Sequence, residues 1–166
     1  MLNETAKIVE LSDSIYQSDS FDEVLNGLQS KNKTLPTKFL YDSEGSKLFD
    51  KICETKEYYP TRTEEAIFDT YASDIVAKSS PDEIFEIGSG SSRKTNKLID
   101  ACIVSKIKPI YSAMDISSKA LLMSAEKMRA NYKNIKLNLF LGDYNKDLNK
   151  IPSNTRNKLF AFLGST

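Results

Sequence analysis

The sequence predicts an α/β fold in which an incomplete parallel sheet follows an N-terminal helical extension. After Pro81, short apolar runs alternate with helical patterns, and this alternation is typical of βαβ units. Before Pro81, apolar residues recur mainly at helical spacing. We therefore expect two regions, a helical region over 1–80 and the first half of a sheet domain over 81–166.

The N-terminal region is expected to contain several amphipathic helices. Apolar residues over 2–28 predict two short helices separated by a polar break. A turn over 42–45 is expected to precede a helix over 46–54. Thr61 and Glu64 have the spacing of a capping box, so a longer helix is expected to start at Thr61.

The sheet domain is expected to alternate buried strands with amphipathic helices. The strands are expected over 83–87, 109–114, 135–141 and 159–163, and the helices over 92–104 and 117–129. The last apolar run has no further strand to pair with, so we expect it to form an uncovered edge of the sheet.

Composition excludes several classes of function. Lys plus Arg and Asp plus Glu both number 23, so no net charge is available to gather nucleic acid. The absence of His removes the commonest metal ligand and general base, and we propose no metal site. Cys53 and Cys102 lie far apart and are interpreted as buried thiols. Without a signal peptide or a membrane-length apolar run, the expected location is cytoplasmic, with no membrane partner.

The most informative segment is a glycine turn between the first buried run and a helix. Gly88 and Gly90 allow the backbone to turn sharply and to approach a ligand closely. Arg93 stands where a dinucleotide-binding fingerprint requires its third glycine, which disfavours a nicotinamide dinucleotide. Glu86 would repel a pyrophosphate but suits an ammonium or sulfonium group, and S-adenosyl-L-methionine carries both.

Acidic residues follow the next two expected strands. Asp115 can accept hydrogen bonds from both ribose hydroxyls, although it can equally cap the following helix. Asp143 can accept from an adenine amino group, and Tyr144 can line the ring, although a Gly-Asp turn alone is common. In strand order, the glycine turn and the two acids are the cofactor signals of a class I (Rossmann-like) methyltransferase.

Longer segments resemble one family of such enzymes. These segments are 38–42, 45–50, 57–64, 86–95 and 162–166. They are similar to the histidine Nα-methyltransferases of ergothioneine biosynthesis, and the resemblance covers about 35–166. It implies S-adenosylmethionine as cofactor, L-histidine as the amino-acid substrate, and trimethylation of the histidine α-amino group to hercynine.

The resemblance also implies roles for particular residues. The cofactor would be bound by Gly88, Lys94, Asp115, Asp143 and Tyr144, with Lys94 reaching the methionine carboxylate. Substrate binding would involve Tyr41 and Tyr58, with Tyr59 as a neighbour that stays open. Two adjacent tyrosines are also common in cores, so packing is the alternative for this pair. Methyl transfer is expected to proceed by in-line attack without a covalent intermediate, and no catalytic residue is assigned.

The family's pattern continues beyond Thr166. A methyltransferase sheet needs about seven strands, whereas four are expected here, so we expect this chain to be an inactive fragment. Three alternatives remain: a methyltransferase of the same fold acting on another small amine, a truncated cofactor-binding protein without catalysis, and a nucleotide-dependent oxidoreductase, which Arg93 disfavours.

Overall fold

The computed structural model describes residues 8–11, 18–40, 43–89 and 93–163. Tyr41 and Gly90, both singled out from the sequence, lie outside the described residues. The chain forms two compact units, one over 14–63 and the other over 1–13 with 64–166. The sequence predicts a functional boundary near residue 80, whereas the boundaries of the compact units fall at residues 13 and 63. The functional boundary therefore stays a prediction.

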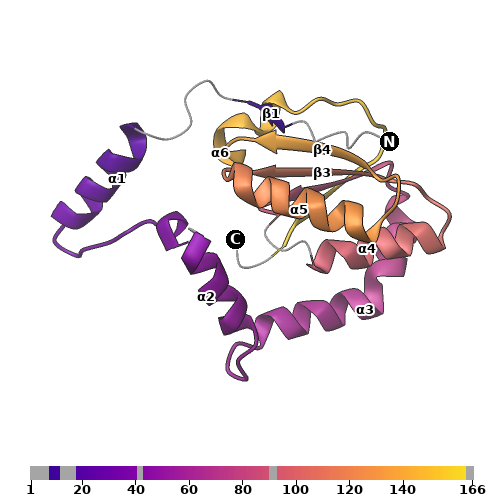
Figure 1. The fold of residues 1–166 in the computed structure, drawn as a ribbon, viewed down its shortest axis with the longest axis horizontal. Helices are drawn as coiled ribbons and strands as arrows, with labels where there is room; N and C mark the ends of the chain where they lie inside the picture. The colour runs from indigo at the N-terminus through magenta and orange to yellow at the C-terminus, as the bar shows by residue number, and fades with distance from the viewer. Residues whose placement is uncertain (1–7, 12–17, 41–42, 90–92, 164–166) are drawn as a thin grey trace. The chain divides into compact units, whose positions relative to one another are not determined.

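The larger unit is built on a five-stranded sheet in which all strands are parallel, in the order β1-β4-β3-β2-β5 (Figure 1). The strands are β1 (Ile8–Glu10), β2 (Glu83–Ile87), β3 (Ile110–Asp115), β4 (Lys136–Leu141) and β5 (Lys158–Phe162). Successive strands run outward from β2 through β3 to β4, and β5 then pairs on the other side of β2. The α/β prediction is confirmed, and β5 lies at an edge as expected.

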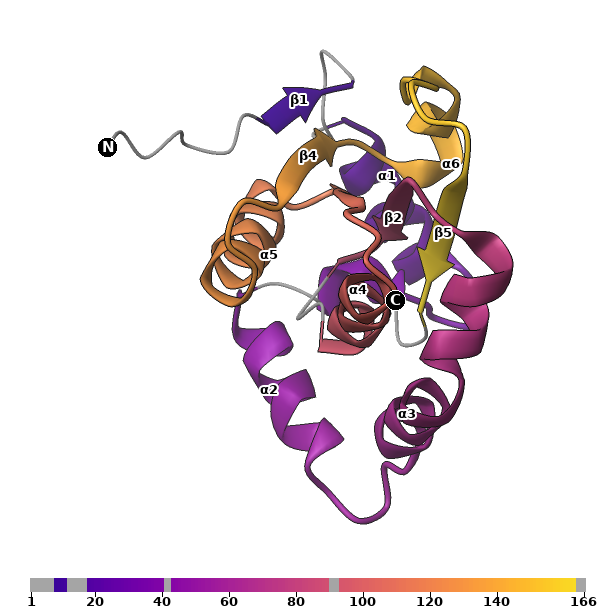
Figure 2. The same ribbon diagram turned by 90° about the vertical axis from the view of Figure 1, so that its right-hand side faces the viewer.

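One face of the sheet is covered by α4 (Arg93–Val104) and α5 (Ser118–Asn131), which Figure 2 shows on the same side of the strands. The buried Glu86 carboxylate accepts hydrogen bonds from Thr95 of α4 and, at 2.5 Å, from the Tyr111 hydroxyl. The Tyr111 hydroxyl oxygen also lies 3.0 Å from Ser124 Oγ of α5. These contacts attach both helices to the middle of the sheet. Glu86 therefore lies inside a protein network, not in the ligand-facing position expected from the sequence.

The opposite face carries an apolar cluster of Phe85, Ile87, Met114 and Phe140. The Phe85 and Phe140 rings are stacked with their centroids 5.8 Å apart. Leu11 and Ile151, which lie outside the strands, pack against this cluster. Because both faces of β2 are covered, all of its residues are buried, including Glu83 and Glu86.

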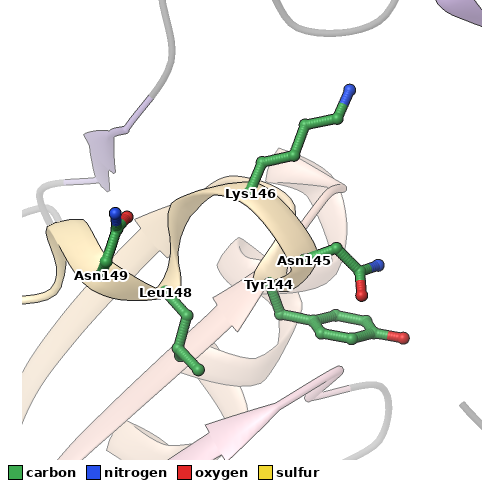
Figure 3. Close-up of a pocket in the computed structure, with 5 residues that line it drawn as sticks. All are labelled: Tyr144, Asn145, Lys146, Leu148 and Asn149. Atoms are coloured by element: carbon green, nitrogen blue, oxygen red, sulfur yellow. The ribbon is translucent and has the colours of Figure 1, made fainter.

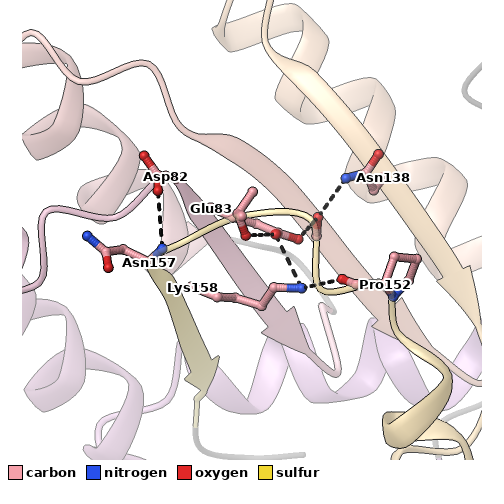
Figure 4. A network of polar contacts seen from close by, with 8 residues as sticks. Asp82, Glu83, Asn138, Pro152, Asn157 and Lys158 are labelled. Atoms are coloured by element: carbon pink, nitrogen blue, oxygen red, sulfur yellow. Dashed lines mark hydrogen bonds and ion pairs between the residues drawn. The ribbon is translucent and has the colours of Figure 1, made fainter.

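A buried polar network lies at the amino ends of the strands (Figure 4). Glu83 is only 3% exposed, and its carboxylate accepts hydrogen bonds from Ser112 Oγ at 2.5 Å and from Thr155 Oγ1 at 2.7 Å. Asn138 Nδ2 donates to Ser112 Oγ at 3.1 Å. Lys158 Nζ lies 3.2 Å from Glu83 Oε2. The network thus connects β2 to both neighbours, β3 and β5.

The helix expected near the N-terminus is wrong at residues 8–10, which form β1. Ile8 pairs with Leu139 and Val9 with Phe140, in parallel with β4. Branched side chains at Ile8 and Val9 favour a strand, and three residues are too few for their spacing to distinguish the two structures. The free edge of β4 supplies the backbone partners, so tertiary pairing decides the outcome.

The smaller unit is helical, with α1 (Ser18–Gln29), a 3-10 helix (Thr37–Leu40) and α2 (Ser43–Cys53). Because α2 begins at Ser43, the turn expected over 42–45 is wrong for residues 43–45. The next helix, α3, spans Pro60–Ser79 and joins the two units. It begins at Pro60, a residue suited to the first helical position. The capping box is also wrong: Thr61 Oγ1 donates to Cys53 Sγ at 3.3 Å.

The two cysteines differ in their surroundings, and neither forms a disulfide. Cys102 is fully buried, and this burial raises its pKa to about 11, whereas Cys53 is partly exposed. We expect a thiol reagent at pH 8 to modify Cys53 quickly and Cys102 only on unfolding, because almost no Cys102 thiolate exists at that pH. Cys53→Ser should abolish the fast phase of labelling and Cys102→Ser should preserve it; a fast phase that is lost only in Cys102→Ser would contradict this assignment.

None of the helices in the described part of the chain is long and apolar enough to cross a membrane.

Candidate functional site

The turns that follow β2, β3 and β4 lie side by side. Gly88 N donates to Met114 O at 2.9 Å, and Gly142 N donates to Asp115 O at 3.0 Å. These two bonds continue the parallel ladders one step beyond the ends of the strands. The structure therefore brings together the glycine turn, Asp115 and the Gly142-Asp143 turn, in the order the sequence predicts. In open parallel sheets, ligands bind at this edge, near the point where strand order reverses.

Gly88 is required by the backbone at the end of β2. Its φ is 68°, in the left-handed region that residues with a Cβ rarely adopt. The next residue, Ser89, is 2% exposed. A substitution at Gly88 would therefore strain the turn that leads from the sheet to α4.

Asp115 ends β3, and its side chain is not the cap of α5. Ser117 is the N-cap, and its Oγ accepts from Ala120 N at 3.2 Å. Asp115 Oδ1 instead accepts from Ser117 N at 2.9 Å. The capping role considered for Asp115 is therefore wrong, and the role in ribose binding stays a prediction.

Burial raises the pKa of Asp115, although hydrogen bonds from the backbone N–H groups of Ser117, Ile116 and Ser89 lower it in part. The bond from Ser89 connects this carboxylate to the glycine turn. A carboxylate held in a desolvated position at a strand end is typical of a binding group, because burial there costs free energy in the empty protein.

The raised pKa leads to a prediction about pH. The folded chain binds the Asp115 proton more tightly than the unfolded chain does, so ionised Asp115 lowers the free energy of unfolding at neutral pH. Asp115→Asn should therefore raise the Tm of the unliganded chain at pH 7. The gain should shrink as pH falls through the raised pKa, because wild-type Asp115 is then neutral too. A thermal melt series over pH measures this, and a lower Tm for the variant at pH 7 would contradict it.

The turn after β4 is fixed by Asp147, a residue that the sequence did not single out. Asp143 is the N-cap of the short helix α6 (Tyr144–Asp147), and its Oδ1 accepts from Asn145 N at 2.9 Å. Asp147 is 2% exposed, and its Oδ2 accepts from Asp143 N at 2.9 Å. Lys150 Nζ donates to Asp147 Oδ1 at 2.8 Å. A Cβ on Gly142 would lie 2.9 Å from Asp147 Oδ2, which explains the glycine.

Tyr144 lies at the rim of this turn. It is 42% exposed, and its ring centroid lies 5.4 Å from that of Phe162 in β5. A surface hollow of about 560 Å³ lies beside α6 and is lined by Tyr144, Asn145, Lys146, Leu148 and Asn149 (Figure 3). The hollow does not include Gly88, Lys94 or Asp115, so we do not assign the predicted ligand to it alone.

Lys94 is the second residue of α4. Its Nζ lies 2.5 Å from Glu64 Oε2 of α3, and its side chain is 15% exposed. The resemblance implies that Lys94 binds a carboxylate, and in the structure it holds one from the protein itself. The contribution of Lys94 to ligand binding stays a prediction.

The tyrosines expected to bind substrate belong to the smaller unit. The Tyr58 and Phe49 rings meet edge to face, with centroids 5.7 Å apart and an interplanar angle of 81°. Tyr59 is 67% exposed. Tyr58 therefore has a packing contact as well as its predicted role, and Tyr59 is open to solvent. The substrate-binding role of both residues stays a prediction.

A parallel sheet with a glycine turn and acids at the ends of successive strands defines an α/β protein that binds a nucleoside-containing ligand. Within that class, the chain belongs to the family of S-adenosylmethionine-dependent, histidine-specific methyltransferases, whose family model matches residues 20–166. The resemblance read from the sequence is thereby confirmed. Sequence reasoning missed the role of Asp147, which accepts from the Asp143 backbone. It also placed Glu64 in a capping box, whereas Glu64 pairs with Lys94 of another helix.

Two bacterial relatives illustrate the similarity. The chain is 39% identical over 144 residues to the histidine N-alpha-methyltransferase of Mycolicibacterium smegmatis. This match covers 87% of this chain and 44% of the relative. The chain is 37% identical, with the same coverage of both chains, to the enzyme of Mycobacterium tuberculosis. The chain thus spans less than half the length of these relatives.

A solved structure of an S-adenosylhomocysteine-bound methyltransferase from Podospora anserina is also similar, at 14% identity and a TM-score of 0.43. The match covers 76% of this chain and 59% of that one. The similarity is too low to support an argument about this site.

Proposed function

We propose that this chain is the cofactor-binding part of a histidine Nα-methyltransferase, which trimethylates the α-amino group of L-histidine to hercynine. The observation that carries the proposal is the alignment of the Gly88 turn, Asp115 and the Gly142-Asp143 turn at one edge of the sheet. Family membership supplies the reaction class.

The residues at this edge fit S-adenosylmethionine. Asp115 is a partly buried carboxylate that does not cap α5, which suits it to accept from two ribose hydroxyls. Asp143 is held by its backbone and offers carboxylate oxygens to an adenine amino group, with Tyr144 beside the ring. Gly88 lets the backbone approach the ligand, and Lys94 supplies a cation for its carboxylate.

When bound, S-adenosylmethionine supplies an electrophilic methyl group on its sulfonium. The residues of this chain act by binding and orientation, because in-line transfer to an amine needs alignment and exclusion of water more than it needs a base. We place Tyr41, Tyr58 and Tyr59 in substrate positioning, as part of a region over 1–80 that contributes to the histidine site. This placement rests on the family resemblance.

The remaining parts of the proposal concern partners and location. We expect an amino acid as the substrate, and we expect neither a nucleic acid nor a membrane as a partner. The balanced charge of the chain supports the absence of a nucleic-acid partner. Two unpaired thiols suit a reducing cytoplasm, which we propose as the location.

Competition among amines tests the substrate. Because this chain spans 44% of its bacterial relatives and is expected to be inactive alone, the assay uses the full reading frame that contains it. That protein is incubated with S-adenosylmethionine carrying a labelled methyl group, and L-histidine competes with histamine and other α-amino acids as acceptor. We expect label in trimethylated histidine, since the family is histidine-specific. Preferential labelling of another amine, or no labelling of any, would contradict the proposal.

A further inference from the structure

Among the side chains that the structure describes, two ion pairs between α3 and α4 differ in burial. Lys94 and Glu64 are 15% and 27% exposed, with 2.5 Å between Nζ and Oε2. Lys97 and Asp69 are 31% and 64% exposed. An exposed pair contributes little, whereas a shielded pair holds its partners more firmly. The two pairs thus join the same helices with different expected strengths.

The better-shielded pair includes a residue of the helix that follows the glycine turn in the chain. Lys94 is in the first turn of α4, directly after the glycine turn that leaves β2, and Glu64 lies near the beginning of α3. A lysine side chain is long and flexible, and fixing it costs rotamer entropy. An ammonium also has three donors, so it can serve one carboxylate and still donate to a second.

We propose that Glu64 is a positioning residue for the cofactor. It holds the Lys94 ammonium beside the glycine turn, where the ammonium also donates to the carboxylate of the methionine part of S-adenosylmethionine or S-adenosylhomocysteine. This inference rests on the proposed function, in which Lys94 binds that carboxylate. Without the Glu64 charge, the Lys94 ammonium loses this contact and more rotamers become available to it, so ligand binding must order the side chain at a greater entropic cost.

The test uses two ligands that differ only in the part Lys94 would contact. S-adenosylhomocysteine has the amino-acid end, and 5′-methylthioadenosine has the same adenine, ribose and sulfur without it. In calorimetric titrations, Glu64→Gln should raise the Kd for S-adenosylhomocysteine about 10-fold, as for loss of one preorganised charged contact. The Kd for methylthioadenosine should stay the same.

Asp69→Asn is the matched control, because it removes a second, more exposed ion pair between the same two helices. It should change neither Kd. In a Lys94→Ala background, Glu64→Gln should have no further effect on S-adenosylhomocysteine binding, because Glu64 acts through Lys94. Glu64→Asp keeps the charge and should recover most of the affinity. If Glu64→Gln does not fold, Glu64→Ala takes its place and should raise the Kd for S-adenosylhomocysteine in the same way.

The outcomes separate the inference from the proposed function. Equal weakening of both ligands by Glu64→Gln would show a general structural role and overturn the inference. Unchanged or tighter binding of S-adenosylhomocysteine would also overturn it, since Glu64 would then be neutral or a competitor for Lys94. Failure of the wild-type chain to bind S-adenosylhomocysteine would instead contradict the proposed function.

Discussion

Asp115→Ala is expected to weaken S-adenosylhomocysteine binding by on the order of 100-fold, because two hydrogen bonds to an ionised carboxylate are lost. Asp115 is the last residue of β3 and lies between the turns that follow β2 and β4. The cap of α5 is Ser117, so it does not depend on the Asp115 side chain. The substitution should therefore leave the fold intact. Calorimetric titration gives the Kd, and circular dichroism confirms that the variant is folded.

Asp74→Ala is the control for this change, because Asp74 is an exposed carboxylate on α3. It should bind S-adenosylhomocysteine like the wild type. A folded Asp115→Ala variant with the wild-type Kd would remove Asp115 from the ribose site.

Glu83→Gln is expected to lower the free energy of unfolding by about 3 kcal/mol, because it leaves a shielded lysine without its countercharge. Lys158 is 13% exposed, and its Nζ lies 5.2 Å from the centroid of the Phe85 ring and 3.0 Å from Pro152 O. Neither neighbour carries a compensating charge. The Tm should fall by roughly 6–12 °C, given about 2–4 °C per kcal/mol for a chain of this length.

Two variants separate the charge effect from other causes. Asp69→Asn breaks a more exposed ion pair and should lower stability by less than about 1 kcal/mol. Glu83→Leu combined with Lys158→Met replaces both charges by apolar groups and should recover most of the loss. Urea unfolding measures all three proteins. If Glu83→Gln is no more destabilising than Asp69→Asn, the network does not hold β5 on β2.

The sheet could be predicted because its inner strands are encoded locally. In strand β2 the apolar residues Ile84, Phe85 and Ile87 lie between Pro81 and the glycine turn, and these breaks mark the strand in the sequence although it also contains two glutamates. The β1 strand could not be predicted, since a three-residue segment becomes a strand only when the β4 edge is beside it. The start of α3 was missed by one residue, because Pro60 begins the helix before the apparent capping residue.

The site could be predicted to the level of its turns but not of its supporting contacts. Gly88, Asp115 and Asp143 follow successive strands, so the parallel topology alone brings them together. Asp and Ser both cap helices well, so residue type alone does not distinguish Asp115 from Ser117 as the cap of α5. The backbone geometry at these two residues decides it. The position of Glu86 depends on Tyr111, a partner on another strand.

The central claim is that the carboxyl edge of this sheet binds S-adenosylmethionine. Calorimetric titration of the chain with S-adenosylhomocysteine, beside an identical titration with NAD, tests it most directly. We predict saturable binding of S-adenosylhomocysteine and no binding of NAD, because the turn after β2 lacks the third glycine of a dinucleotide site. A folded chain that binds neither ligand, or that binds NAD as tightly, would contradict the claim.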